Sequence, residues 1–374
     1  MSAARPPAGA GSEVRSTAAS KSPYRVALVM IARNEASRIV RALASVANCV
    51  DELVVLDTGS NDATVALARS AGARVGHFTW CDDFSAARNA ALKLADADWN
   101  VVVDADEWIA EAGIELLSLR HTTPDFVGTL RVDSHFDTPI GVSIAPSWLP
   151  RVLPRGVRYE GHVHEQPVHR HEVRRLETVL AHDGYRSDAL KSKAGRNADL
   201  LARALAQAPD DAYLHYQLGK DHDVYERYLD ACAHFARSRA CEDASGVTVT
   251  LAGTKPGWHH DRLVREIHAL KKCHQHAQGV LLAESAMVDW AHSPDFFFAL
   301  GDLLLDWATE EPARAGELLP MIESAWLRCV EIGERPDLEG SVAGRGSALA
   351  ARNLAVLYEG TGQALKMQAL RQRR

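Results

Sequence analysis

The sequence of 374 residues has few cysteines, and none of them stands in a metal-binding pattern. The six cysteines are scattered, and no CxxC pair brings two thiols to the spacing of a zinc or redox site. No stretch reaches the ~18 uninterrupted apolar residues that a membrane-spanning helix needs, and the first residues lack the apolar core of a signal peptide. These absences predict a cytoplasmic protein with reduced thiols and no stable membrane insertion.

An excess of positive charge is also absent. Lysine and arginine number 42 and aspartate and glutamate 49, which gives a formal net charge of −7. A general nucleic-acid binder carries a strongly basic face, so we expect no nucleic-acid partner. An anionic ligand would have to be bound by a few local groups.

Glycine-rich phosphate-binding loops are missing as well. The loop after the first apolar run reads Ala32-Arg-Asn-Glu35 and the next, Asp57-Thr-Gly-Ser-Asn61, has one glycine. A dinucleotide site requires GxGxxG at such a position, and a P-loop requires GxxxxGK[ST]. The sequence therefore excludes both kinds of nucleotide site and disfavours a methyltransferase.

Short apolar runs alternate with amphipathic stretches between residues 24 and 109. The runs predict buried strands, and the stretches between them predict helices. One expected helix has Ile39, Leu43 and Val46 on a single face, and another begins at Ser85. The expected strands are 26–31, 53–56, 74–78 and 99–103. This order predicts an α/β fold with a mostly parallel sheet.

The rest of the chain changes character twice. Residues 110–190 are rich in proline and in short alternating runs, which predicts a β-rich extension of the same domain, whereas nearly everything after Lys191 has a helical pattern. Leu218-Gly219, Ala231 and Phe235 match the tetratricopeptide (TPR) pattern, although plain helix pairs explain them nearly as well. We expect a disordered tail at 1–23, an α/β domain at 24–190 and a TPR-like helical domain at 191–374.

Polar clusters follow three of the expected parallel strands. The carboxyl ends of such strands meet at one edge of the sheet, where ligands bind. Asp104 and Asp106 follow the fourth strand, and two carboxylates spaced in this way can address one Mn²⁺ or Mg²⁺ ion together with phosphate oxygens. The alternative is that Asp106 caps a helix that starts at Glu107. Asp57 can accept hydrogen bonds from a base or ribose, or can belong to a simple turn.

A histidine-rich segment follows about 60 residues after the carboxylate pair. If residues 162–165 are extended, His162 and His164 share a face and Glu165 points the other way. Glu165 is a plausible general base, and His182 a further metal ligand. Each histidine alone is more simply explained as a surface residue. Arg88, on an expected helix, could reach a base or a phosphate.

Four blocks of sequence, taken together, resemble the family 2 glycosyltransferases of GT-A fold. They begin at Met30, Asp51, Trp80 and Asp98 and end at Glu35, Thr64, Asn89 and Glu107. The segments Gly161–Glu165 and His182–Tyr185, with a TPR-like tail, are similar to the peptide S-glycosyltransferases of the sublancin type. The first blocks also resemble lipopolysaccharide core glycosyltransferases.

The resemblance implies a role for each matching residue. It places the donor nucleotide at six residues (Ala32, Asn34, Glu35, Asp57, Arg88 and Asp104) and the metal, Mn²⁺ or Mg²⁺, at three (Asp104, Asp106 and His182). Glu165 would be the base, and His164 could replace it, because the family's usual late aspartate has no clear copy here.

The function expected from this resemblance is metal-dependent, inverting transfer of a sugar from a UDP-sugar to a peptide or protein, at a Cys sulfur or a Ser/Thr oxygen. The absence of a basic or amphipathic membrane-binding run favours a peptide over a lipid acceptor. Two alternatives stay open: a saccharide or lipopolysaccharide core transferase, and an inactive TPR-like adaptor that binds peptides. The apolar helical tail permits a homodimer.

Overall fold

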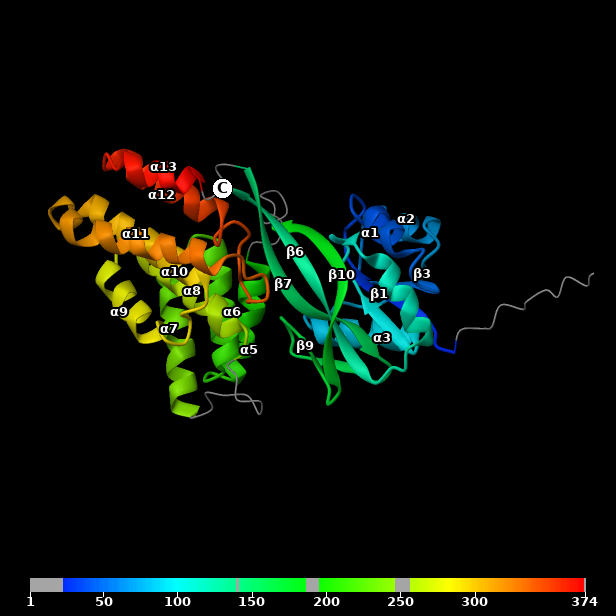
Figure 1. Ribbon diagram of the computed structural model, residues 1–374. Helices are drawn as coiled ribbons and strands as arrows, with labels where there is room; N and C mark the ends of the chain where they lie inside the picture. Colours follow the sequence, from blue (N-terminus) through cyan, green and yellow to red (C-terminus); the bar gives the residue numbers. More distant parts are fainter. Residues whose placement is uncertain (1–22, 139–140, 186–194, 246–255, 373–374) are drawn as a thin grey trace, which may run out of the picture.

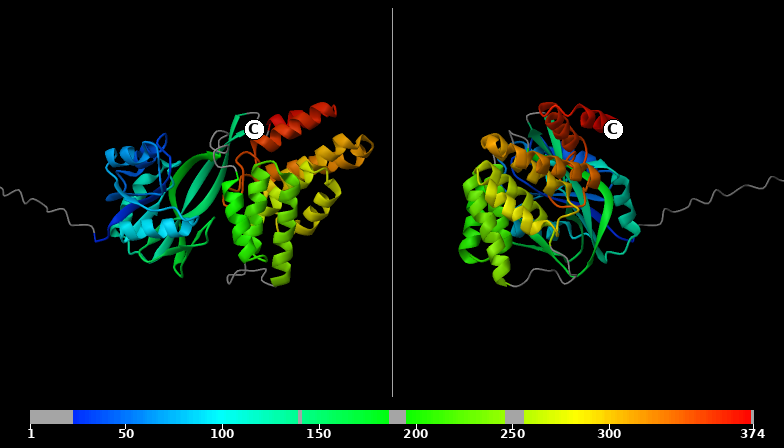
Figure 2. Two further views of the ribbon diagram at one scale, coloured as in Figure 1. Left: turned by 180° about the vertical axis from the view of Figure 1, so that it is seen from behind. Right: turned by 60° about the vertical axis from the view of Figure 1, so that its left-hand side comes forward.

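The computed structural model describes residues 23–138, 141–185, 195–245 and 256–372. The expected tail at 1–23, except Pro23, and the domain boundary expected at 190 lie outside these residues. The described chain forms two parts that lie side by side (Figures 1 and 2): a sheet part, residues 23–185, and a helical part, residues 195–372. No described helix combines the length and the apolar character needed to cross a membrane.

The sheet part is built on an eight-stranded sheet in the order β3-β2-β1-β4-β7-β6-β10-β5. Strands β1 to β4 pair in parallel, and the pairs β4–β7, β6–β7 and β10–β5 are antiparallel. The strands are β1 Val26–Ala32, β2 Glu52–Asp57, β3 Arg74–His77, β4 Trp99–Val102, β5 Glu107–Glu111, β6 Phe126–Thr138, β7 Gly141–Pro154 and β10 Glu172–Tyr185. Two short strands, β8 Arg158–Glu160 and β9 Gln166–Val168, form a separate hairpin.

Three helices and a 3₁₀ segment complete the sheet part: α1 Ile39–Val46, α2 Thr64–Ser70, α3 Phe84–Ala95 and η1 Gly113–His121. The predicted apolar face of α1 is buried at Ile39, Leu43 and Val46. Helix α3 begins at Phe84, one residue before the predicted start at Ser85. The helix is capped by the Asp83 carboxylate, which accepts a hydrogen bond from the Ala86 amide at 2.9 Å.

The segment after β4 corrects a second expectation. The helix proposed to start at Glu107 does not form; Glu107–Glu111 is strand β5, paired with β10. Trp108 and Ile109 favour a strand, and β10 offers an open edge for pairing. Asp106 is therefore no helix cap, and its side chain stands in the tight turn between two strands.

The helical part is an array of antiparallel helix pairs, as the small residues in the sequence predict. Its helices are α5 Arg196–Gln207, α6 Ala212–Val224, α7 Tyr228–Ser245, α8 Trp258–Lys272, α9 His276–Ala286, α10 Pro294–Glu310, α11 Ala315–Ile332, α12 Ala348–Gly360 and α13 Ala364–Gln372, with η2 at Pro312–Arg314. A Cβ atom on Gly219 would lie 2.6 Å from the Phe235 ring, and one on Gly301 2.5 Å from Trp326. Glycine thus permits the close approach of α6 to α7 and of α10 to α11.

The two parts contact each other through apolar packing and through hydrogen bonds. Val163 packs among Leu200, Leu201 and Leu218 of α5 and α6, and the Ala343 amide donates to the Ile144 carbonyl of β7 at 2.9 Å. These contacts place α5 and α6 beside the ends of the parallel strands (Figure 1).

Candidate active site

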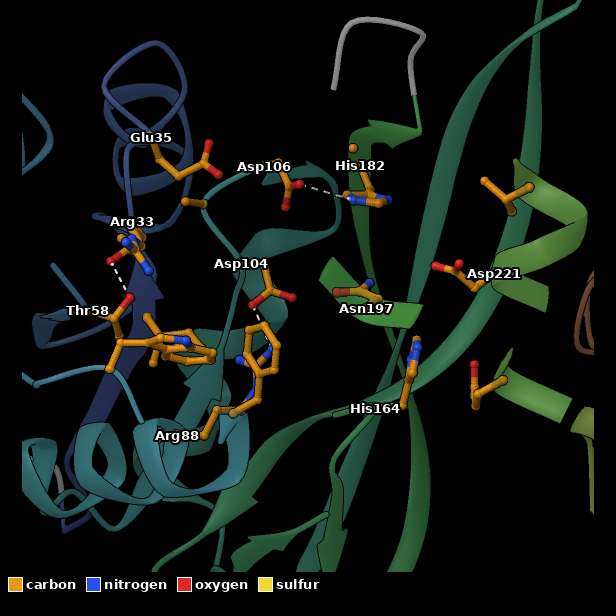
Figure 3. A pocket seen from close by; sticks show the side chains of 18 of the residues that line it. Arg33, Glu35, Thr58, Arg88, Asp104, Asp106, His164, His182, Asn197 and Asp221 are labelled. Atoms are coloured by element: carbon orange, nitrogen blue, oxygen red, sulfur yellow. Dashed lines mark hydrogen bonds and ion pairs between the residues drawn. The ribbon is translucent and has the colours of Figure 1, made fainter. Parts of the chain in front are cut away.

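A cavity of about 330 Å³ opens at the carboxyl ends of β1, β2 and β4, at the edge predicted from the sequence. The sheet part supplies one wall and the helical part the other (Figure 3). Among the predicted site residues, seven line it: Ala32, Glu35, Arg88, Asp104, Asp106, His164 and His182. A larger cavity of about 1040 Å³ adjoins it and is lined by Glu165 as well.

Asp104 is held between two arginines. One of its oxygens accepts from Arg88 Nη2 at 2.9 Å and the other from Arg151 Nη2 at 3.0 Å. Burial opposes ionisation, but the two guanidinium groups prevail and lower the pKa of Asp104 to about 2. Both oxygens are thus already engaged, which leaves Asp104 less suited to a metal than its neighbour Asp106.

Asp106 and His182 lie next to each other on the cavity wall, because strands β5 and β10 are paired. Asp106 Oδ2 lies 3.5 Å from His182 Nε2, and the Ser134 hydroxyl lies 3.2 Å from His182 Nδ1. Ligands about 2.1 Å from an octahedral Mn²⁺ or Mg²⁺ ion are roughly 3.0 Å apart, so a small rearrangement would let both bind one ion. Figure 3 shows Glu35 along the same rim.

Asp106 and His182 both pack closely against Gly184. A Cβ atom there would lie 2.3 Å from His182 Nε2 and 2.6 Å from Asp106 Oδ2. Real Cβ atoms do not approach so closely, so any side chain would displace one of the two groups. The pair and the opening beside it fit a bound cation.

The end of β10 is anchored beside the pair. Asp183 accepts a hydrogen bond from Arg41 Nη2 at 2.6 Å and forms an ion pair with Arg38, whose Nε lies 3.4 Å away; its amide donates to the Asp106 carbonyl at 3.3 Å. The Arg41 guanidinium also lies 3.7 Å from the centre of the Trp108 ring. His182 is therefore placed by its neighbour in the sequence.

Arg88 is set up to bind a further acceptor. Its Nη2 and Nε bind Asp104 and Glu165, whereas its Nη1 is buried and has no hydrogen-bond partner in the described part of the chain. Asn89 fixes this part of α3 by exchanging two 2.8 Å hydrogen bonds with the Tyr159 backbone. An unpaired buried donor costs free energy, and a ligand oxygen would satisfy it.

The segment of Glu165 is not the extended strand assumed from the sequence. Residues 161–164 form a bend, and His164 has a left-handed φ of 51°. His162 turns out to Asp83, at 3.3 Å, whereas His164 lines the cavity. Burial and the charge of Lys220 lower the pKa of His164 to about 4, so its imidazole is neutral near pH 7.

Two predicted nucleotide-binding residues do not line the cavity. The Asn34 side chain accepts from the Asn61 amide at 2.9 Å. Asp57 is buried and accepts from the amides of Gly59 and Ser60 at 3.2 and 3.1 Å. Both shape the loops, which then present Ala32 and Thr58.

Several lining residues were not identified from the sequence. The aromatic pair Trp80 and Phe84, in T-shaped contact with centroids 4.8 Å apart, belongs to a block that was noted, but neither residue was assigned to the site. Arg151 stands in an apolar strand, where an arginine needs a buried partner, and that was the available signal. The helical part adds Asn197, Gln217, Lys220, Asp221, Val224 and Tyr225, for which the sequence holds no local signal.

Parts of this chain are similar to known proteins. Residues 27–162 match the model of the family described as glycosyl transferase family 2. A TPR repeat-containing protein of Synechococcus elongatus is 39% identical over 211 residues, 52% of this chain and 51% of that protein. The SPbeta prophage-derived glycosyltransferase SunS of Bacillus subtilis is 24% identical over 218 residues, 56% of this chain and 52% of that protein.

This chain thus spans about half the length of the curated relatives it matches. Among solved structures, glucosyl-3-phosphoglycerate synthase from Mycobacterium tuberculosis, in complex with Mn²⁺, UDP and glucosyl-3-phosphoglycerate, is 24% identical. The match covers 31% of this chain and 46% of that one, with a TM-score of 0.25.

Proposed function

We propose that this chain, whose residues 27–162 form a family 2 glycosyltransferase domain, moves a sugar from a UDP-sugar to a peptide or protein in a metal-dependent reaction. One observation carries the proposal: Asp106 and His182 lie 3.5 Å apart on the wall of the cavity, and both pack so closely on Gly184 that no other residue would fit there. This arrangement suits a cation between the chain and a diphosphate.

The donor is assigned to the wall formed by the sheet part. Asp106 and His182 would hold Mn²⁺ or Mg²⁺, which when bound supplies positive charge against the diphosphate. The unsatisfied Nη1 of Arg88 offers a hydrogen bond to a uracil or phosphate oxygen. Trp80 and Phe84 offer apolar surface to the base, and Ala32 and Thr58 border the same space.

Asp104 contributes through its arginines. It is ionised at any physiological pH because its pKa is about 2, and it fixes the guanidinium groups of Arg88 and Arg151. Arginines held in this way stabilise negative charge on the departing diphosphate without reorganising during the reaction. We assign Asp104 to positioning these two residues and to the donor ribose.

The acceptor is assigned to the larger cavity between the two parts. Its volume of about 1040 Å³ and its polar lining, which includes Gln217, Lys220 and Asp223, suit an extended peptide segment. A nucleophile that enters from this side attacks the anomeric carbon opposite the diphosphate. A single displacement of this kind inverts the configuration.

His164 and Glu165 remain the two candidate bases. Glu165 accepts from Arg88 Nε, so its carboxylate already holds this guanidinium group. His164 faces both cavities and, with a pKa of about 4, is about as basic as an ordinary carboxylate. We assign His164 as the base and Glu165 as the residue that positions Arg88.

The variants His164→Ala and Glu165→Gln separate these roles. If His164 is the base, His164→Ala loses transfer to the acceptor and keeps the affinity for UDP. Glu165→Gln releases Arg88 and so raises the KM for the donor. The opposite pattern, with affinity lost in His164→Ala and only kcat lost in Glu165→Gln, would reverse the assignment.

Turnover of UDP-sugars tests the proposal as a whole. We expect UDP release and a hexose-sized mass addition to acceptor peptides with Mn²⁺ and none with a chelator. Asp106→Asn should lower turnover by ~100-fold or more, as the loss of one charge-stabilising group does elsewhere. Asp96→Asn, at a side chain 71% exposed, is the matched control and should retain full activity. Peptide binding without any turnover would favour the inactive adaptor.

A further inference from the structure

We infer that the helical part carries a second metal site, for a divalent ion of the zinc class, formed by His274, His276, Asp306 and Glu310. One ligand atom from each of the four residues lies within 4.8 Å of the others. The cluster is separate from the candidate active site, because none of these residues lines either cavity. The inference therefore does not depend on the proposed function.

The four side chains come from two segments that the fold brings together. His274 lies in the turn between α8 and α9, where its φ of 58° turns the chain, and His276 is the first residue of α9. Asp306 and Glu310 stand one turn apart near the end of α10, so both carboxylates project from the same face of that helix.

The four side chains lie close enough to gather around one ion. His276 Nε2 lies 3.1 Å from an Asp306 oxygen, and His276 Nδ1 lies 3.7 Å from a Glu310 oxygen. His274 Nδ1 contacts the other Glu310 oxygen. Ligands about 2.0–2.1 Å from a zinc ion are roughly 3.3 Å apart, and the four ligand atoms lie within 4.8 Å of one another, so the carboxylates must rotate toward one nitrogen of His276 to close around the ion.

The surroundings of the cluster favour a cation, and they hold one of the two imidazoles, that of His276, in place. The His276 side chain is only 5% exposed and is stacked on Trp307, with an angle of 13° between the rings. Asp306 and Glu310 lie beside the two ring nitrogens and bring negative charge to both sides of this imidazole. Glu310 also ends α10, and the carbonyl end of a helix attracts positive charge.

The ligand set selects the class of metal and the role of the site. Two imidazoles with two carboxylates suit zinc, whereas calcium and magnesium prefer oxygen ligands alone. Four protein ligands fill a tetrahedral shell, which is typical of a structural site. Bound zinc would join the α8–α9 turn to the end of α10 and would stabilise the helical part.

Zinc titration of the metal-stripped full chain, with a competing chromophoric chelator, tests this inference. We expect one tight site in the wild-type chain and at least a tenfold loss of affinity in His274→Asn and in Glu310→Gln. His274 is 70% exposed, so its variant should fold normally. Asp302→Asn, one turn earlier on α10 and paired with Lys271, is the matched control and should keep the affinity.

Two further measurements make the result unambiguous. Cobalt substituted for zinc should give the intense visible bands of a tetrahedral centre in the wild type and in Asp106→Asn, which removes the other candidate site. These bands should be lost in His274→Asn, and the melting temperature should rise with zinc only where the bands form. Equal zinc affinity in the wild type, His274→Asn and Glu310→Gln would overturn the inference and leave the cluster as ion pairs alone.

Discussion

At the scale of single residues, Gly184 is the most sensitive position of the candidate site. We predict that Gly184→Ala lowers the rate of sugar transfer by about 10- to 100-fold, because the new Cβ displaces Asp106 or His182. The loss of a residue that supports a metal ligand has an effect of this size. Steady-state kinetics over a range of Mn²⁺ concentrations measures the effect. Gly316→Ala, at a position with open space around it, should change nothing; equal activity in the two variants would contradict the geometry.

Arg151 is the second residue for which the site makes a strong prediction. It lies 2.5 Å from Glu107, whose side chain is 3% exposed, and 3.0 Å from Asp104. Burial raises the pKa of Glu107, and Arg151 opposes that rise. Arg151→Gln would leave two carboxylates without this partner and should cost about 3–5 kcal/mol in the free energy of unfolding.

Urea unfolding measures this cost. Arg155→Gln removes an arginine that is half exposed and pairs with Asp96 and Asp98, so it should cost about 1 kcal/mol at most. Similar stabilities of the Arg151 and Arg155 variants would show that the buried pair contributes little.

At the scale of elements, the four parallel strands β1 to β4 and the helices between them could be predicted from hydrophobic periodicity. The runs at 26–31 and 53–56 correspond to β1 and β2, because a buried parallel strand has a nearly continuous apolar sequence. Strand β5 could not be predicted, since Glu107–Glu111 is stabilised by pairing with β10, about 70 residues later. The bend at His164 was also missed, because it depends on packing of Val163 against α5 and α6.

The contact between α6 and α7 gives a prediction for an element pair. Gly219→Val places a branched side chain against Phe235, where even a Cβ atom would lie at 2.6 Å, and should destabilise the helical part by about 1–3 kcal/mol. Calorimetric melting measures the loss. Gly316→Val, in open space on α11, is the control. Because α6 carries Gln217 and Lys220, Gly219→Val should also impair transfer to the acceptor; an unchanged melting temperature would contradict the close packing.

At the scale of the whole molecule, the two parts share one site, and the sequence alone could not reveal this. It predicted a sheet region followed by helices and brought Asp104 and Asp106 to one edge by strand order, with His182 proposed separately as a further metal ligand. It offered no means to place α6 there, since its contacts with the sheet part involve residues far apart in the chain. The acceptor wall, with Gln217, Lys220 and Tyr225, therefore emerges only from the structure.

Acid should destabilise the folded chain through His268. This histidine lines the larger cavity, and its pKa is lowered to about 4, mainly by burial, with Lys271 among the charges that add to the effect. Between pH 6.5 and 4 this histidine binds a proton in the unfolded chain but not in the folded chain. The free energy of unfolding therefore decreases as the pH falls through that window. Relative to His268→Asn, the wild type should lose about 2 kcal/mol between pH 7 and 5. Urea unfolding of both proteins at pH 7 and 5 measures this loss. If the difference in unfolding free energy between the two proteins stayed constant with pH, the prediction would be refuted.

The central claim is that Asp106 and His182 together hold the cation that binds the donor diphosphate. Calorimetric titration of UDP into the chain tests it most directly, because the signal reports the nucleotide and not the zinc-class site of the helical part. We predict UDP binding that requires Mn²⁺ and that Asp106→Asn and Gly184→Ala both weaken by at least tenfold, with Asp96→Asn unchanged. UDP binding that is equally tight with a chelator, or equally tight in Asp106→Asn, would contradict the account.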